Sequence, residues 1–264
     1  MISHLHKCIF IHITKCAGSS VEHGLGVYYK DTRSANYENA FGWCPKLKLF
    51  MQHATPQQML DTGLIKRADW DQYYKFIVVR NPWERAYSDY FWVMRNSSAK
   101  GSFDDFIRAK GKFSNILIRN PEDFRGEHLY QQKDYFFVDG TPIHYDSIIR
   151  YEALTLGLET VAQDLNLPPT AFASHINQFP KRISHYSHFY SDKRKRLVET
   201  EFKHDISFLN YVFEDRRTPL TRLRALTPSL FALGGSQFIK MRYPVLHQRL
   251  KAAKKSLFKV SYGS

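Results

Sequence analysis

The chain has few cysteines and no apolar run long enough to cross a membrane. It contains three cysteines, Cys8, Cys16 and Cys44, too few and too scattered for a disulfide framework or a zinc site. We therefore expect reduced thiols, a cytoplasmic location and no bound metal. No stretch reaches the roughly 20 apolar residues of a spanning helix, and the polar residues at His4 and Lys7 argue against a signal peptide. Internal repeats and low-complexity tracts are also lacking.

Acidic residues are missing from the C-terminal fifth of the chain. Residues 216–264 hold 11 Lys or Arg and no Asp or Glu, so residues 1–215 carry only +2 of the net charge of +13. The near-neutral body argues against nucleic-acid binding, and the basic tail favours a local anionic partner.

The tail also has an amphipathic helical pattern over residues 244–260, with Leu246, Leu250, Ala253 and Leu257 on one face. It predicts adsorption to an anionic membrane surface. Packing on the protein's own domain and binding of a polyanionic glycan are the alternatives.

The remainder alternates strand and helix patterns. Strands are predicted at residues 7–13, 46–51, 73–80 and 146–151, and helices at residues 83–95, 103–109, 153–165 and 192–205. Such alternation indicates an α/β fold with a central, mostly parallel sheet flanked by helices. We expect one domain over residues 1–215 and a basic helical appendage over residues 216–264.

Two helix starts are marked by their capping residues. Asn81 and Pro82 directly follow the third predicted strand, as the N-cap and first residue of a helix. Thr55 and Gln58 have the spacing of a capping box. The first of these starts lies beside the residues with the clearest functional pattern.

The loop after the first predicted strand has the composition of an anion site. It reads Thr-Lys-Cys-Ala-Gly-Ser-Ser from Thr14 to Ser20, so one lysine accompanies backbone N–H groups at a helix start. It departs from the nucleotide P-loop, because Lys15 precedes Gly18 by three residues and no glycine lies five positions ahead of the lysine. By itself it could also be a turn that happens to hold a lysine.

A second motif follows the third strand. It reads Arg-Asn-Pro-Trp-Glu-Arg-Ala-Tyr-Ser-Asp-Tyr from Arg80 to Tyr90. It places Arg80 at a strand end and Ser88 two turns into the next helix. Both side chains are therefore expected near the carboxyl edge of the sheet, where they could hold a second phosphate.

Together the two motifs resemble those of sulfotransferases that use 3′-phosphoadenosine 5′-phosphosulfate (PAPS), in the branch of the heparan-sulfate 2-O-sulfotransferases and bacterial glycan sulfotransferases. The likeness covers about residues 5–215 and implies a P-loop-like three-layer fold. It departs from the family pattern where Thr14 replaces Pro and where Cys16 and Ser19 replace Thr. It implies that the 5′-phosphosulfate is held by Lys15, Cys16, Ala17, Gly18, Ser19 and Ser20, and the 3′-phosphate by Arg80 and Ser88.

The resemblance also implies a reaction. A carbohydrate hydroxyl would attack the sulfur of PAPS in line, with His53 as catalytic base and Lys15 stabilising the developing charge, and with no metal. His53 could instead cap a strand end. A lipid-linked glycan acceptor would place the enzyme at the inner face of a membrane. Two rivals remain: an inactive scaffold that binds anionic glycans or nucleic acid, and an atypical nucleotide kinase or NTPase.

Overall fold

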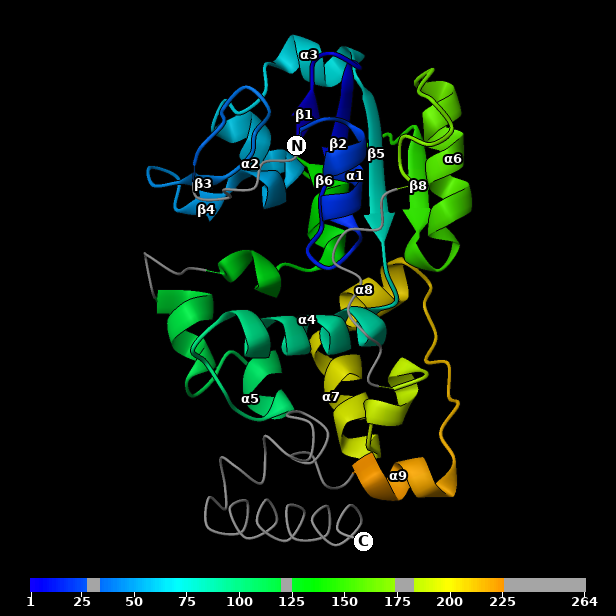
Figure 1. Ribbon diagram of the computed structural model, residues 1–264. Coiled ribbons are helices and arrows are strands. Elements are labelled where there is room, and N and C mark those ends of the chain that lie inside the picture. Colours follow the sequence, from blue (N-terminus) through cyan, green and yellow to red (C-terminus); the bar gives the residue numbers. More distant parts are fainter. Residues whose placement is uncertain (28–33, 120–124, 174–182, 226–264) are drawn as a thin grey trace, which may run out of the picture.

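A four-stranded sheet forms the centre of the upper half of the molecule in Figure 1. The computed structural model describes residues 1–27, 34–119, 125–173 and 183–225. The strands lie in the order β1-β2-β5-β8. Their bounds are Ile2–Ser3 for β1, Cys8–Ile11 for β2, Tyr74–Val79 for β5 and Ser147–Arg150 for β8. The pairs β2–β5 and β5–β8 are parallel, and β1 runs antiparallel to β2.

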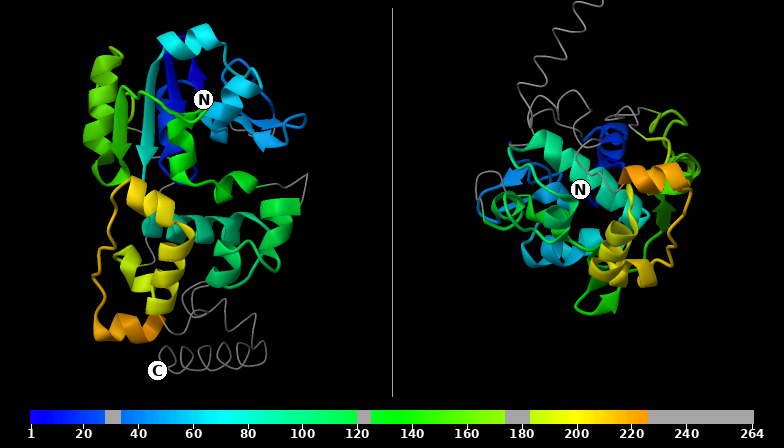
Figure 2. Two further views of the ribbon diagram at one scale, coloured as in Figure 1. Left: turned by 180° about the vertical axis from the view of Figure 1, so that it is seen from behind. Right: turned by 90° about the horizontal axis from the view of Figure 1, so that it is seen from below.

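The two central strands are buried because both sheet faces are covered. All four residues of β2 are buried, as is β5 from Lys75 onward, which explains their nearly continuous apolar sequences. Helix α1 (Gly18–Gly24) lies on one face in Figure 1, and the segment around β6 (Phe137–Val138) lies on the other in the rear view of Figure 2. Helix α6 (Leu154–Asp164) packs against β8 at the edge. The predicted layered α/β fold is thus confirmed.

The strand predicted at residues 46–51 is not part of this sheet. Only β4 (Leu49–Phe50) forms there, and it pairs with β3 (Trp43–Cys44) in a separate hairpin. Lys48 turns the chain with a φ of 52°, which leaves too short an extended run to join the sheet. A single 3-10 turn, η1 (Met51–His53), follows, and then α2 (Pro56–Asp61). The predicted capping box of Thr55 and Gln58 is present at the start of α2.

Helices occupy the half of the molecule below the carboxyl ends of the strands. Helix α4 (Pro82–Asn96) follows β5 and crosses beneath the sheet (Figure 1), and the Asn81 side chain accepts a hydrogen bond from the Trp83 N–H at its start. The helix predicted at residues 192–205 is interrupted at Phe202. Helices α5 (Phe103–Ile107), α7 (Asp192–Glu201) and α8 (Lys203–Phe208) also lie in this half, whereas α3 (Arg67–Gln72) lies at the opposite end of the sheet (Figure 1).

The first residues beyond the predicted domain boundary still pack on the helical half. Arg217 is paired with Asp192 and Asp215 and its side chain is 4% exposed. Helix α9 (Pro219–Ala225) packs on the short helix at Tyr186–Phe189. The amphipathic segment 244–260 lies outside the described residues. Within those that are described, no helix is long and apolar enough to span a bilayer.

Candidate functional site

The loop between β2 and α1 has a backbone shaped for an anion. Lys15 and Ala17 have φ values of 67° and 62°, and such left-handed residues among right-handed ones turn successive N–H groups toward one side. The N–H groups of Ala17, Gly18 and Ser19 make no backbone hydrogen bond within the described residues. The loop therefore offers several donors to a phosphate or sulfonate.

Gly18 is required in this loop by a neighbouring histidine. A Cβ atom at Gly18 would lie 1.7 Å from Nε2 of His12, so only glycine allows the imidazole to pack against the loop backbone. The His12 Nδ1 is 2.7 Å from Oε1 of Glu22, and both side chains are buried. This pair ties the end of β2 to α1 and fixes the entrance and exit of the loop.

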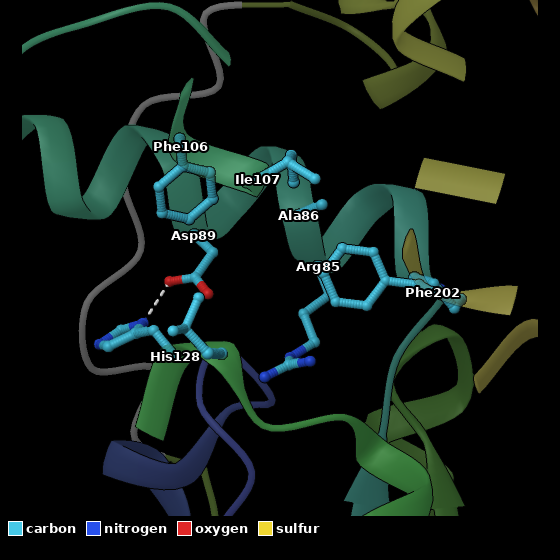
Figure 3. A pocket seen from close by; sticks show the side chains of 9 residues that line it. Arg85, Ala86, Asp89, Phe106, Ile107, His128 and Phe202 are labelled. Carbon is cyan, nitrogen blue, oxygen red and sulfur yellow. Dashed lines mark hydrogen bonds and ion pairs between the residues drawn. The ribbon is translucent and has the colours of Figure 1, made fainter. Parts of the chain in front are cut away.

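Two arginines from the second motif hold the loop from below. The Arg85 guanidinium donates to the carbonyl and hydroxyl oxygens of Thr14 at 3.2 and 2.9 Å, and Figure 3 shows its side chain extending away from α4. The Arg80 Nη1 donates to the Lys15 carbonyl at 2.9 Å. The Thr14 hydroxyl, which a proline would lack, is thus one of the oxygens that fix the loop.

Arg80 is buried yet not fully satisfied. It forms a 2.9 Å ion pair with Glu84 and its guanidinium carbon lies 3.9 Å from the centre of the Tyr151 ring. Its Nε has no hydrogen-bond partner in the described structure. A buried donor without a partner fits a site that an anion completes. Ser88, the other residue expected at the second phosphate, is half-buried on α4.

The Lys15 ammonium faces an aromatic ring. Its Nζ lies 5.4 Å from the centre of the Trp92 ring on α4, and no ion pair of Lys15 with another described residue is present. Burial lowers the pKa of Lys15 from 10.5 to about 8, with the Asp89 carboxylate acting in the opposite direction and the Arg80 charge adding to the lowering. Lys15 is therefore a desolvated cation, charged at neutral pH.

His53 lies beside the loop with a defined tautomer. Its Nδ1 donates to the His12 carbonyl at 3.1 Å, and its ring meets the His12 ring edge-on at 4.2 Å. The Tyr135 hydroxyl donates to the His53 carbonyl at 3.0 Å. Burial, helped by the neighbouring His12, lowers the pKa of His53 well below its usual value. The ring is thus neutral at pH 7, with the proton on Nδ1 and a lone pair on Nε2.

The remaining predicted residues of the loop contribute to the candidate site more through their backbone than through their side chains. The Cys16 thiol is buried, where burial raises its pKa to about 12, and the Cys16 N–H bonds to the Ile13 carbonyl at 3.3 Å. Ser19 is half-buried and Ser20 is buried on the first turn of α1. The binding roles expected for these residues stay predictions.

Other residues around the loop carry no sequence signal that marks them. Gln132 is fully buried and pairs with both backbone groups of Arg80 at 2.8 and 2.9 Å. His128 is hydrogen-bonded to Asp89 through Nδ1 (Figure 3) and stacks on Trp92. Asp89 lies within the second motif and Trp92 two residues beyond its end, which is the hint that the sequence offers.

These elements define an α/β protein with a candidate anion site at the carboxyl ends of its parallel strands. The chain matches the model of the Sulfotransferase family over residues 1–212, and it belongs to this family. Membership of a sulfotransferase family, predicted from the two motifs, is thus confirmed, and with it sulfuryl transfer as the general reaction; the predicted branch stays a prediction. Neither a curated protein nor a solved structure matches the chain.

Proposed function

We propose that this protein transfers the sulfuryl group of PAPS to a hydroxyl of a carbohydrate acceptor. The observation that carries the proposal is that two cationic side chains, Lys15 and Arg80, belong to one hydrogen-bonded structure. Lys15 stands in the nest-like loop, and Arg80, with its unpartnered Nε, bonds directly to the loop backbone. A nucleotide with phosphate at both its 5′ and 3′ positions supplies an anion for each, and its phosphosulfate supplies the group that moves.

Lys15 and the loop would hold the donor and stabilise its reaction. The N–H groups of Ala17, Gly18 and Ser19 would bind the 5′ oxygens, and the Lys15 ammonium would face the bridging oxygen, where negative charge develops as the sulfuryl group leaves. A desolvated ammonium acts more strongly there than one in water. Removal of such a group is expected to slow transfer on the order of 100-fold or more.

His53 would accept the proton of the acceptor hydroxyl. Its Nδ1–H is committed to the His12 carbonyl, so Nε2 is the only ring nitrogen that can take a proton. The lowered pKa keeps His53 neutral and ready at pH 7. The alternative of a histidine that only caps the hairpin predicts no effect on the rate when His53 is replaced.

Two other functions make different predictions. A magnesium-dependent kinase needs a hydroxyl ligand directly after the loop lysine, and position 16 holds a buried thiol instead. A non-catalytic binder would bind donor product without turnover.

We place the acceptor among bacterial lipid-linked glycans, capsule or lipopolysaccharide, made at the cytoplasmic face of a membrane.

The test is transfer of labelled sulfur from PAPS to a panel of glycans, with binding of adenosine 3′,5′-bisphosphate and of ATP measured in parallel. We expect transfer that falls at least 100-fold in Lys15→Ala, Arg80→Ala and His53→Gln, with Lys46→Ala, an exposed lysine, as the control. Undiminished transfer in the first two variants would refute the site. Tight ATP binding without binding of the bisphosphate would refute the donor.

A further inference from the structure

The Trp92 ring attracts the Lys15 ammonium without neutralising its charge. Lys15 is half-buried, and its ammonium lies over the Trp92 ring at 5.4 Å. The face of an indole attracts an ammonium through its quadrupole and leaves the full positive charge for an incoming anion. A carboxylate at the same place would compete with the phosphosulfate.

The orientation of the Trp92 ring is in turn held by a stacked imidazole, that of His128. His128 stacks on the indole with ring centres 4.9 Å apart and planes inclined by 24°. The His128 Nδ1 is hydrogen-bonded to Asp89, one turn before Trp92 on α4, and the two side chains are 4% and 5% exposed. A buried, hydrogen-bonded imidazole has little freedom to rotate, so the indole against it is held in one orientation.

We propose that Trp92 is a positioning residue for Lys15, and that the buried Asp89–His128 pair sets the orientation of the Trp92 ring. The inference rests on the proposed role of Lys15 in binding the donor, and it extends that role to residues more than 70 positions away in the sequence. It also gives the Asp89–His128 pair a purpose other than proton transfer, since its imidazole stacks on the indole.

The proposal is tested by a double-mutant cycle between Trp92 and Lys15. The variants are Trp92→Leu, Lys15→Met and both together, and the quantity is the dissociation constant of adenosine 3′,5′-bisphosphate. We expect Trp92→Leu to weaken binding about 5- to 30-fold in the wild-type background, as a desolvated cation–π contact predicts. Once Lys15 is methionine, the same change should alter binding less than about twofold. Equal weakening in both backgrounds would overturn the proposal.

Two further variants distinguish loss of the aromatic contact with Lys15 from a general disruption of the fold. Trp92→Phe keeps an aromatic face and should restore binding to within about threefold of wild type. His128→Asn keeps a donor for Asp89 but removes the stacking surface, so it should weaken binding, and only where Lys15 is present. The matched control is Phe137→Leu, which removes another ring beneath a lysine, Lys133 at 5.8 Å, and should leave binding unchanged.

The same cycle also works without any ligand. If the wild type fails to bind the bisphosphate, the donor assignment is refuted, but the contact between Lys15 and Trp92 can still be read from urea unfolding. Non-additive shifts of the unfolding midpoint in the two single variants and the double variant support the positioning role. Additive shifts overturn it, whatever the donor is.

Discussion

Replacement of Lys15 by methionine should make the protein more stable while it slows sulfuryl transfer. Methionine keeps the unbranched shape of lysine and removes the charge. The fall of the Lys15 pKa from 10.5 to about 8 means that the folded state holds the charged lysine at a disadvantage of about 3 kcal/mol relative to the unfolded chain. Loss of the contact with Trp92 reduces this gain in the free energy of unfolding by about 0.5–2 kcal/mol. A net gain of about 1–3 kcal/mol at pH 7 is therefore expected.

The gain should depend on pH in a defined direction. Below pH 8 Lys15 is charged in both states, so the whole disadvantage is present. Between pH 8 and 10.5 the unfolded chain binds more protons than the folded one, so the wild type gains stability as the pH rises. The difference between Lys15→Met and wild type should accordingly shrink from pH 7 to pH 9.5.

Urea unfolding at several pH values measures this difference, with Lys46→Met at an exposed lysine as control. A Lys15→Met variant that is less stable than wild type at pH 7, or a difference that stays constant up to pH 9.5, would refute the reasoning. The bisphosphate should raise the melting temperature of wild type by more than that of Lys15→Met, which binds it more weakly. Binding sites commonly retain a charged residue that lowers the stability of the folded protein because function requires it.

Three other substitutions or truncations have expected outcomes. Gly18→Ala places a Cβ atom 1.7 Å from His12 Nε2, so bisphosphate binding should be lost, and retained affinity in calorimetry would contradict the loop geometry. Gln132→Leu leaves the buried N–H and C=O of Arg80 unpaired and should lower the free energy of unfolding by about 2–4 kcal/mol, whereas an unchanged urea midpoint would contradict it. The chain cut after Ala225 should no longer sediment with anionic liposomes, and undiminished sedimentation would refute membrane binding by residues 244–260.

The parts of the site that could be predicted from sequence are those built from contiguous residues. The loop from Thr14 to Ser20 follows a strand and begins a helix, and strand ends, capping residues and a lysine are all readable in a single stretch. Arg80 could be placed for the same reason, since Asn81 and Pro82 mark the end of one element and the start of the next. Both positions depend on local chain geometry, which short sequence patterns record.

The supporting residues could not be predicted, because tertiary packing alone brings them to the loop. Gln132 lies in a short 3-10 helix far along the chain, and its burial depends on where that segment crosses the sheet. His128 is in a similar turn, and its hydrogen bond to Asp89 and its stacking on Trp92 place it next to α4. Neither segment has the periodicity from which a buried face can be read. The prediction of a sheet strand at residues 46–51 was wrong for a related reason, because the strand that forms there, β4, pairs with β3 in a separate hairpin.

Helix α4 joins both ends of the proposed donor site to one rigid element. Arg80, two residues before the helix begins, bonds to the Lys15 carbonyl, while Arg85 and Trp92 from within the helix contact Thr14 and the Lys15 ammonium. Contacts from the helix and from the residue just before it therefore fix the loop at its backbone and at its cation. A shift of α4 would therefore displace the two anion positions together, so the distance between them is set by the helix and not by the loop. That arrangement suits a ligand with two anionic groups at a constant separation, and it explains why the two motifs follow neighbouring strands of one sheet.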